Sequence, residues 1–426
     1  MGQNAPVLRH CPIDTSTVTL TSTGAPSSTH LRSDVGRSPL SFYVHVPFCA
    51  RRCGYCAFVT SAPGEVVGPT GEVPGEWTAR HRLWADAAAA EVGLAAERLG
   101  SDVPPIGSIY FGGGTPTAVD ASLIVGVLEA IGRNFELVDD IEVTVEANPD
   151  GLATGQLDRL VDGGVTRISF GMQSTSESAL RTLDRTHPGT LAPAAVSAAR
   201  LAGAAHVSLD LIYGTPGETD DEWAASVRTA LSCDVDHISA YSLSVEPRTR
   251  LAARIRTGQL PHPDPDSAAR RYRIADEACQ EAGFEWYELS NWAAEPAARC
   301  RHNLGTWRDH DWWGIGPGAH SHVGRQRWWN HSSERTWAGD VRSGGVPAAG
   351  HEVLDEDSRR CERIMLGIRL REGLAIDERM DPAVLEELAS SGLIGLIPTA
   401  GPPGAELIVL TAQGRLVADH VVRSLL

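Results

Sequence analysis

The sequence lacks the segments that would place a protein in or across a membrane. Its N-terminus has no positively charged stretch followed by an apolar one, as a secretory signal would have. No apolar run reaches the length of about 18 residues that a membrane-spanning helix needs. We therefore expect no integral membrane segment, and a soluble, cytoplasmic protein.

Basic side chains are scarce relative to acidic ones. The chain has 37 Lys and Arg against 54 Asp and Glu, a formal net charge of −17 at pH 7. An excess of negative charge repels the phosphate backbone of nucleic acids and the surface of anionic membranes. Nucleic acid is therefore not an expected partner.

Cysteine is also infrequent, with eight residues in a chain of 426. Five of them are scattered without the regular spacing of a disulfide framework, which indicates buried or incidental thiols. These five are Cys11, Cys233, Cys279, Cys300 and Cys361. Free thiols suit the reducing cytoplasm.

The other three cysteines, Cys49, Cys53 and Cys56, fall within eight positions of one another. They follow an apolar, β-branched run that predicts a strand over 40–46. Such spacing allows three thiolates to converge from one loop on a single inorganic centre. A 4Fe-4S cluster has four irons, so three cysteines would leave one iron open to a further ligand.

Zinc is the competing interpretation of this loop. Three Cys and one His form a common structural zinc site, and His45 lies four residues before Cys49. The distant second pair of cysteines that usually completes such a zinc loop is not found. A disulfide is weaker still, because three cysteines so close together pair awkwardly. We favour the iron–sulfur cluster and keep zinc as the alternative.

The chain divides into four expected regions. Residues 1–38 are rich in Ser, Thr, Pro and Gly, which predicts a disordered extension. Residues 39–260 contain six apolar strand candidates separated mostly by helices, which predicts an α/β fold with a parallel sheet, either doubly wound or closed into a barrel. The strand candidates are 40–46, 106–111, 141–147, 166–172, 206–213 and 237–243.

Polar residues recur where these strands end. Glu146, Gln173 and Asp210 occupy such positions, and ligands of parallel α/β folds gather at the carboxyl ends of the strands. The strand over 106–111 runs into three glycines, 112–114, which let a polar ligand approach the backbone closely. A plain tight turn is the simpler interpretation of the glycines, and a role in the scaffold is the simpler one for each polar residue alone.

The remaining two regions have different compositions. Residues 261–354 include an expected irregular segment in which eight of the eleven tryptophans lie between Trp286 and Trp337. These tryptophans predict either core or a flat apolar surface for a planar ligand, with core favoured for most. Residues 355–426 predict a small helical and β domain of winged-helix type. Because it has few basic residues, we expect it to pack or dock rather than bind DNA.

The cysteine loop resembles the CxxxCxxC motif of the radical S-adenosylmethionine (SAM) superfamily. Further blocks resemble the branch that contains the coproporphyrinogen dehydrogenases (HemN) and the HemW-type heme chaperones, over about residues 40–426. These blocks are 43–58, 112–117, 145–149, 169–173, Asp184-Arg185-Thr186-His187 and 210–216.

The resemblance implies a partial (β/α)6 barrel, followed by the smaller C-terminal α+β domain. It implies a 4Fe-4S cluster on Cys49, Cys53 and Cys56, with SAM on the fourth iron. The positions implied for SAM contacts are Tyr43, Gly113, Gly114, Thr115, Glu146, Gln173, Arg185 and Asp210. Their types fit, since glycine backbone and acids suit an ammonium group and Arg185 suits a carboxylate. Reductive cleavage of SAM would supply a 5′-deoxyadenosyl radical.

Two details separate the branches. The dehydrogenases have a further cysteine two residues after the third, where this sequence has Phe58. The heme chaperones have an HNxxYW motif, which 302–307 matches as His-Asn-Leu-Gly-Thr-Trp, with Thr306 in place of tyrosine. Histidine is a common axial ligand of heme iron, so the motif implies His302 as a heme ligand. From chemistry alone, a structural histidine is the simpler interpretation.

These observations predict a heme chaperone that binds heme and passes it to an acceptor protein, with a cluster, SAM and an electron donor as further partners. No net oxidase activity is expected. The alternative is an oxygen-independent coproporphyrinogen III oxidase, in which a radical converts propionate side chains to vinyl groups.

Overall fold

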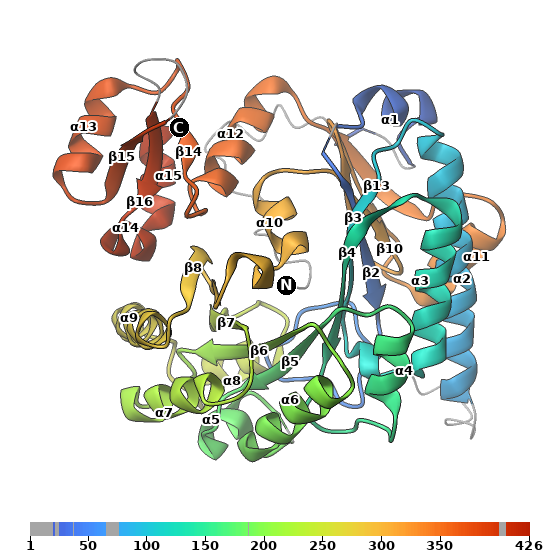
Figure 1. Cartoon of the computed structure of the whole chain (residues 1–426), viewed down its shortest axis with the longest axis horizontal. Helices are drawn as coiled ribbons and strands as arrows, with labels where there is room; N and C mark the ends of the chain where they lie inside the picture. The colour runs from blue at the N-terminus through green and yellow to red at the C-terminus, as the bar shows by residue number, and fades with distance from the viewer. Residues whose placement is uncertain (1–19, 22–24, 37, 65–75, 186, 400–405) are drawn as a thin grey trace.

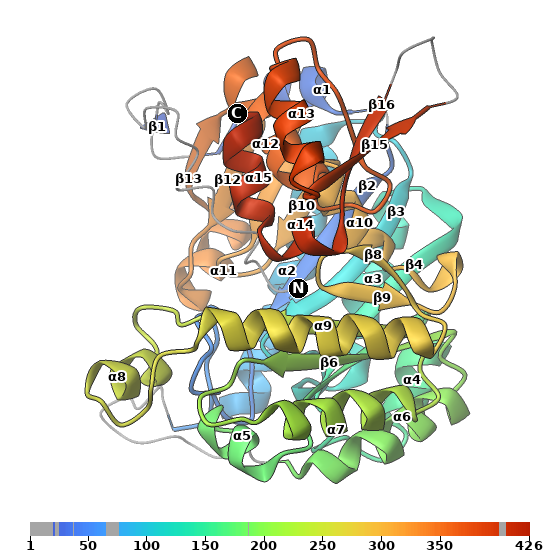
Figure 2. The same ribbon diagram turned by 90° about the vertical axis from the view of Figure 1, so that its left-hand side faces the viewer.

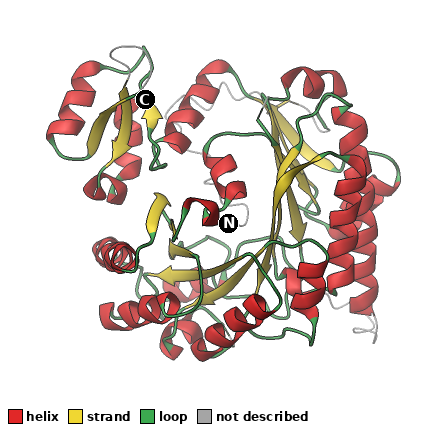
Figure 3. Cartoon of the chain, in the orientation of Figure 1, coloured by secondary structure: helices red, strands yellow, loops and turns green. Residues whose placement is uncertain are grey.

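The computed structural model describes residues 20–21, 25–36, 38–64, 76–185, 187–399 and 406–426. Its centre is one large, curved sheet with a parallel central part and with helices on the convex side (Figures 1 and 3). In spatial order, its strands are β1 (Leu20–Thr21), β13 (Ala348–Val353), β12 (Gln326–Asn330), β11 (His320–Val323), β10 (Trp312–Ile315), β2 (Leu40–Val46), β3 (Ile106–Gly113), β4 (Leu137–Ala147), β5 (Arg167–Gln173), β6 (His206–Tyr213), β7 (His237–Ser242), β9 (Asn291–Ala293) and β8 (Glu285–Glu288).

The six central strands, β2 to β7, pair in parallel and in chain order. Helices connect most of them, as parallel pairing requires. The helices between and after these strands are α2 (Glu76–Leu99), α3 (Ala121–Asn134), α4 (Gln156–Asp162), α5 (Glu177–Thr182), α6 (Ala192–Leu201), α7 (Asp220–Leu231), α8 (Arg250–Arg256) and α9 (Pro265–Glu281). Helices α7 and α9 lie side by side (Figure 2). The expected α/β fold with a (β/α)6 unit is confirmed.

The barrel is partial because its outer strands do not meet. Strand β2 pairs on its free side with β10, and β7 pairs on its free side with β9. The concave side between these edges holds the short helix α10 (Arg301–Trp307) (Figure 1). This helix contributes His302 to the interior of the partial barrel.

The tryptophan-rich segment forms strands, and the expectation that it is irregular was wrong. Strands β10 to β13 and helix α11 (Glu334–Arg342) extend the sheet beyond β2. Trp313, Trp328 and Trp337 are at most 1% exposed and belong to the main core. Their segment has few Val, Ile and Leu residues, the usual strand signal, because the large indole rings fill the core instead.

The N-terminal stretch is ordered where the structure describes it, contrary to the expected disordered extension. Helix α1 (Ser28–Asp34) contributes Leu31, 1% exposed, to the main core, and β1 pairs with β13. Burial of Leu31 beside α2 gives this stretch the apolar contact that its composition did not reveal. Residues 1–19 lie outside the described residues.

The C-terminal region is a small α+β domain with its own hydrophobic core, as expected. Its antiparallel sheet has the order β14, β16, β15. Residues 412–425 form two helices rather than one, because the backbone leaves helical geometry at Val417 (φ −127°, ψ 30°). Its elements are α12 (Glu356–Gly367), β14 (Leu374–Ala375), α13 (Pro382–Ser390), β15 (Ile394–Pro398), β16 (Glu406–Leu410), α14 (Ala412–Leu416) and α15 (Ala418–Leu425).

Glu91 of α2 fastens the added strands to the barrel. Its carboxylate accepts hydrogen bonds from Gly316 N (2.8 Å), Asn330 Nδ2 (2.7 Å) and Trp337 Nε1 (2.8 Å). Glu91 is 1% exposed, and burial raises its pKa to about 7. The folded protein therefore holds a proton there that the unfolded chain releases near pH 4.5.

Stability should consequently fall with rising pH across this interval. The free energy of unfolding of the native protein should decrease by roughly 2.5 kcal/mol between pH 5 and pH 8 relative to Glu91→Gln, which has no proton to lose. Urea unfolding followed by tryptophan fluorescence measures this difference. Glu97→Gln, at an exposed position of the same helix, is the control and should follow the native pH dependence. Parallel pH curves for native protein and Glu91→Gln would contradict the assignment.

Candidate functional site

The concave face of the six central strands is polar, whereas their convex face is apolar. Along β2, Phe42, Val44 and Val46 belong to the main core. The alternate residues of the six strands point the other way, into the partial barrel. They include Ser41, Tyr43, His45, Ser108, Tyr110, Glu142, Thr144, Glu146, Arg167, Ser169, Ser208, Asp210, His237 and Ser239. A buried surface of this composition is suited to a polar ligand.

The cysteine loop follows β2 and is anchored at its start and its middle. Cys49 N donates to Ser61 O (3.0 Å), and Gly54 N donates to Leu183 O (3.1 Å). Gly54 O accepts from Leu251 N of α8 (2.9 Å). A Cβ atom at Gly54 would lie 2.4 Å from Asp184 Oδ2, so the loop needs glycine there. These contacts hold the three thiols at the carboxyl end of the sheet.

The three thiols are close enough to affect one another's ionisation. Burial raises the pKa of Cys49 to about 12 and that of Cys56 to about 11, and neighbouring cysteines add to both shifts. Three thiols placed this close in one loop can bind one inorganic centre together.

His45 is not placed to complete a zinc site. Its Nε2 bonds to Val59 O (2.7 Å), where it must donate, and its Nδ1 accepts from Tyr43 Oη (3.0 Å). Both ring nitrogens are thus used inside the fold. The competing zinc interpretation loses its fourth ligand.

The glycine loop after β3 is tied to the cysteine loop. Gly114 N donates to Val46 O (2.8 Å) and Thr115 N donates to Phe48 O (2.7 Å). The Thr115 hydroxyl also hydrogen bonds to the Cys49 thiol, which lowers the pKa of that thiol. The two predicted ligand-binding segments therefore form one structural unit.

Close approach explains why this loop requires glycine. Gly113 has φ +109°, and a Cβ atom there would lie 2.4 Å from the His45 ring. A Cβ atom at Gly114 would lie 2.5 Å from Phe48 O. The tight-turn interpretation is thus correct for the backbone, and it is compatible with a ligand role.

Two predicted acids meet near this loop. Glu146 accepts from Gly113 N (3.1 Å) and from Tyr110 Oη (2.7 Å). Both carboxylate oxygens of Asp210 accept from Ser169 Oγ (3.0 Å each). Burial, and then the nearby charge of Glu146, raise the pKa of Asp210. The two carboxylates share one electrostatic environment in the barrel interior.

Arg185 and Gln173 lie at the end of β5. Arg185 donates to Asn148 Oδ1 (2.9 Å) and Gly171 O (3.2 Å), while its Nε is buried without a hydrogen-bond partner. The nearby Tyr55 and Cys53 help to raise its pKa although burial lowers it, so its charge is fixed. Gln173 is 7% exposed and has φ +64°. An unpartnered, buried guanidinium nitrogen beside the cysteines is suited to an anionic ligand group.

His302, on α10, lies in the same barrel interior, farther from the carboxyl ends of the strands. Its ring stacks on Tyr110 (centroids 5.0 Å apart, planes at 26°) and lies near Tyr43 (6.4 Å). Its ring neighbours are thus tyrosines of β2 and β3. Burial lowers the pKa of His302 to about 4, so the imidazole is neutral at pH 7. The structure brings it together with Tyr43, one of the predicted SAM contacts.

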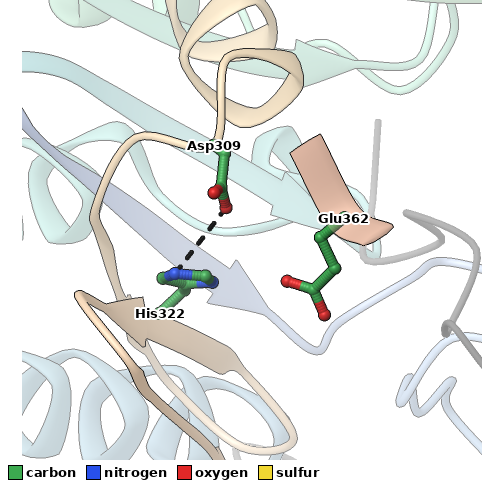
Figure 4. A group of neighbouring side chains, drawn as sticks. All are labelled: Asp309, His322 and Glu362. Atoms are coloured by element: carbon green, nitrogen blue, oxygen red, sulfur yellow. Dashed lines mark ion pairs between the residues drawn. The ribbon is translucent and has the colours of Figure 1, made fainter. Parts of the chain in front are cut away.

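A second group of potential ligands was not found from the sequence. In the part of the chain that the structure describes, one set of three His, Cys or acidic residues has ligand atoms within 4.8 Å of one another, namely Asp309, His322 and Glu362 (Figure 4). Arg359 Nη1 lies 3.0 Å from Asp309 Oδ2, and Arg327 Nη2 donates to Glu362 (2.7 Å). Because arginines already neutralise both carboxylates, the group is an ion-pair network that joins α12 to the sheet.

Comparisons with known proteins show the family to which the chain belongs. Residues 43–230 match the model of the radical SAM superfamily. A heme chaperone HemW from Mycobacterium tuberculosis is 43% identical over 388 residues, which are 91% of this chain and 95% of the relative. This chain belongs to the HemW family. The heme chaperone HemW of Bacillus subtilis is 31% identical and covers 89% of the chain and 97% of its own length.

The solved structure of Escherichia coli coproporphyrinogen III oxidase (HemN), a radical SAM enzyme, superposes with a TM-score of 0.76. It covers 94% of this HemW-family chain and 93% of its own chain at 20% identity, a similarity that shows the fold alone. Radical SAM proteins use a 4Fe-4S cluster and SAM. Among the described residues, no helix is both long and apolar enough to cross a membrane.

Substitution of Gly113 tests the geometry of the glycine loop. Gly113→Ala should lower the free energy of unfolding by about 2 to 3 kcal/mol, because alanine is strained at this φ and its Cβ meets His45. Gly126→Ala in α3 is the control, since a Cβ atom there meets nothing within 4 Å. The control should be neutral or stabilising by about 0.5 to 1 kcal/mol. Equal effects of the two changes on chemical denaturation would refute the argument.

Proposed function

We propose that this HemW-family chain is a heme chaperone, which binds heme and passes it to an acceptor protein. The observation that supports this most strongly is the 43% identity to a named heme chaperone over 91% of the chain. The second is Phe58, which stands where the oxidases have a further cysteine. The proposed partners are heme, SAM, an acceptor protein and an electron donor, in the cytoplasm.

Cys49, Cys53 and Cys56 would hold the 4Fe-4S cluster, and SAM would bind its open iron. The engagement of both ring nitrogens of His45 supports the cluster over zinc. When bound, the cluster and SAM supply one-electron chemistry, which gates or supports heme transfer in our proposal.

The chain's own residues would orient SAM. The fixed positive charge of Arg185, whose Nε has no hydrogen-bond partner, suits the carboxylate of its methionine part. Gly113, Gly114 and Thr115 would contact SAM through their backbone, and the carboxylates of Glu146 and Asp210 offer acceptors to its ammonium and hydroxyl groups. Tyr43 and Gln173 lie beside these groups. Each role fits the hydrogen-bonding capacity of the side chain.

Metal analysis tests the cluster. After anaerobic reconstitution, the native protein should contain iron and sulfide in equal amounts, and Cys53→Ala should lose both, because a thiolate ligand is removed. Cys233→Ala, which removes a free thiol at the end of α7, is the control and should keep the native content. Stoichiometric zinc without sulfide in the native protein would contradict the proposal.

Heme titration tests the chaperone function. The Soret band of the reconstituted native protein should saturate at one heme per chain, and His302→Ala should weaken binding by about 100-fold or more, because it removes the axial ligand. His310→Ala, three residues beyond the end of the same helix, is the matched control. Coproporphyrinogen should not be decarboxylated in a parallel assay with SAM and reductant. Turnover of coproporphyrinogen without heme binding would favour the oxidase instead.

A further inference from the structure

We infer that Ser108 and Glu142 are positioning residues that hold His302 with the lone pair of its Nε2 free, so that this nitrogen is the ligand for heme iron. The inference rests on the proposed function. It identifies the ring nitrogen of His302 that would bind heme iron and the residues that set the orientation of the ring. Neither residue belongs to the motif around His302, since Ser108 lies on β3 and Glu142 on β4.

Glu142 fixes the backbone of His302. Its side chain is 3% exposed, and its two carboxylate oxygens accept from Arg301 N and His302 N, both at 2.9 Å. Arg167 Nη2 lies 3.4 Å from the same carboxylate and balances its charge in the barrel interior. The first turn of α10 is thereby bound to β4, which sets the position of the His302 ring.

Ser108 fixes the tautomer of the ring. Its hydroxyl donates to Ser41 Oγ (2.9 Å), so its one proton is already used. The contact between Ser108 Oγ and His302 Nδ1 (3.1 Å) can then form only if Nδ1 carries the proton. A neutral imidazole has one N–H, so Nε2 has the lone pair.

The Nε2 atom of His302 has no hydrogen-bond partner among the described residues, and the residue is only partly buried. The stacking on Tyr110 keeps the ring plane in place. A lone pair held in this way can bind a metal ion without a change of tautomer.

Two other histidines of the barrel interior show the contrast. His45 uses Nδ1 and Nε2 for Tyr43 and Val59, as described above. His237 likewise bonds to Ser208 Oγ (2.7 Å) and Tyr287 Oη (2.8 Å) through its two nitrogens. These are satisfied structural histidines. His302 differs from them, because its Nδ1 bonds to Ser108 while its Nε2 has no partner among the described residues.

The tautomer gives a test that needs no heme. In the apoprotein labelled with ¹⁵N-histidine, the resonance of His302, assigned by its loss in His302→Ala, should show a protonated Nδ1 and an unprotonated Nε2. Ser41→Ala, which does not touch the ring, should release the Ser108 proton toward Nδ1 and populate the other tautomer. A native His302 with a protonated Nε2 would overturn the inference.

Heme binding gives the second readout. Ser108→Ala and Glu142→Gln should each raise the dissociation constant for heme by about 10- to 100-fold, with an altered Soret band, because outer partners of a metal ligand contribute on this scale. Ser101→Ala, in the exposed loop before β3, is the control. Circular dichroism verifies that each variant is folded, and Ser41→Ala replaces any that is not.

The outcomes separate the inference from the proposed function. Native heme binding in Ser108→Ala and Ser41→Ala, together with loss in His302→Ala, would overturn the positioning role and leave the chaperone proposal standing. Unchanged binding in His302→Ala would overturn His302 as the ligand, and the positioning role with it.

Discussion

The structure depends on the strict alternation of side chains along six parallel strands. Because neighbouring residues point to opposite faces, the same strands supply an apolar convex face for the helices and a polar concave face for ligands. Burial of the first face provides most of the driving force for folding. The second face would be costly if its polar groups were unpaired, so they bond to one another, as Ser169 does to Asp210 and Tyr110 to Glu146.

The alternation of side chains also determines which elements could be predicted from the sequence. The six strands were predictable because their runs of Val, Ile, Leu and Phe are bounded by turns, and the carboxyl ends of parallel strands share one edge. The strands around Trp313 and Trp328 were not predictable, since indole rings replace the aliphatic residues that mark strands. The roles of Ser108 and Glu142 were hidden as well. The alternation of residues along β3 and β4 places the side chains of Ser108 and Glu142 on the concave face. Only the fold shows that α10 packs against this face.

The predicted site residues lie at two levels of the barrel interior. At the carboxyl end, the cysteine loop, the glycine loop, Arg185, Glu146 and Asp210 surround the position proposed for the cluster and SAM. Below it, Tyr43 and Tyr110 form a layer against which His302 stacks. Tyr110 joins the levels, because its hydroxyl bonds to Glu146 while its ring contacts His302. A change at the SAM level thus has a short physical route to the proposed heme ligand.

The proposal that His302 is the axial ligand of heme can be tested directly. The most direct measurement is electron–nuclear double resonance on the low-spin ferric heme complex, prepared with ¹⁵N-histidine. We expect a ¹⁵N coupling from one axial imidazole that disappears in His302→Ala and persists in His310→Ala. An axial coupling unchanged by His302→Ala, or a heme complex with no histidine coupling, would contradict His302 as the heme ligand.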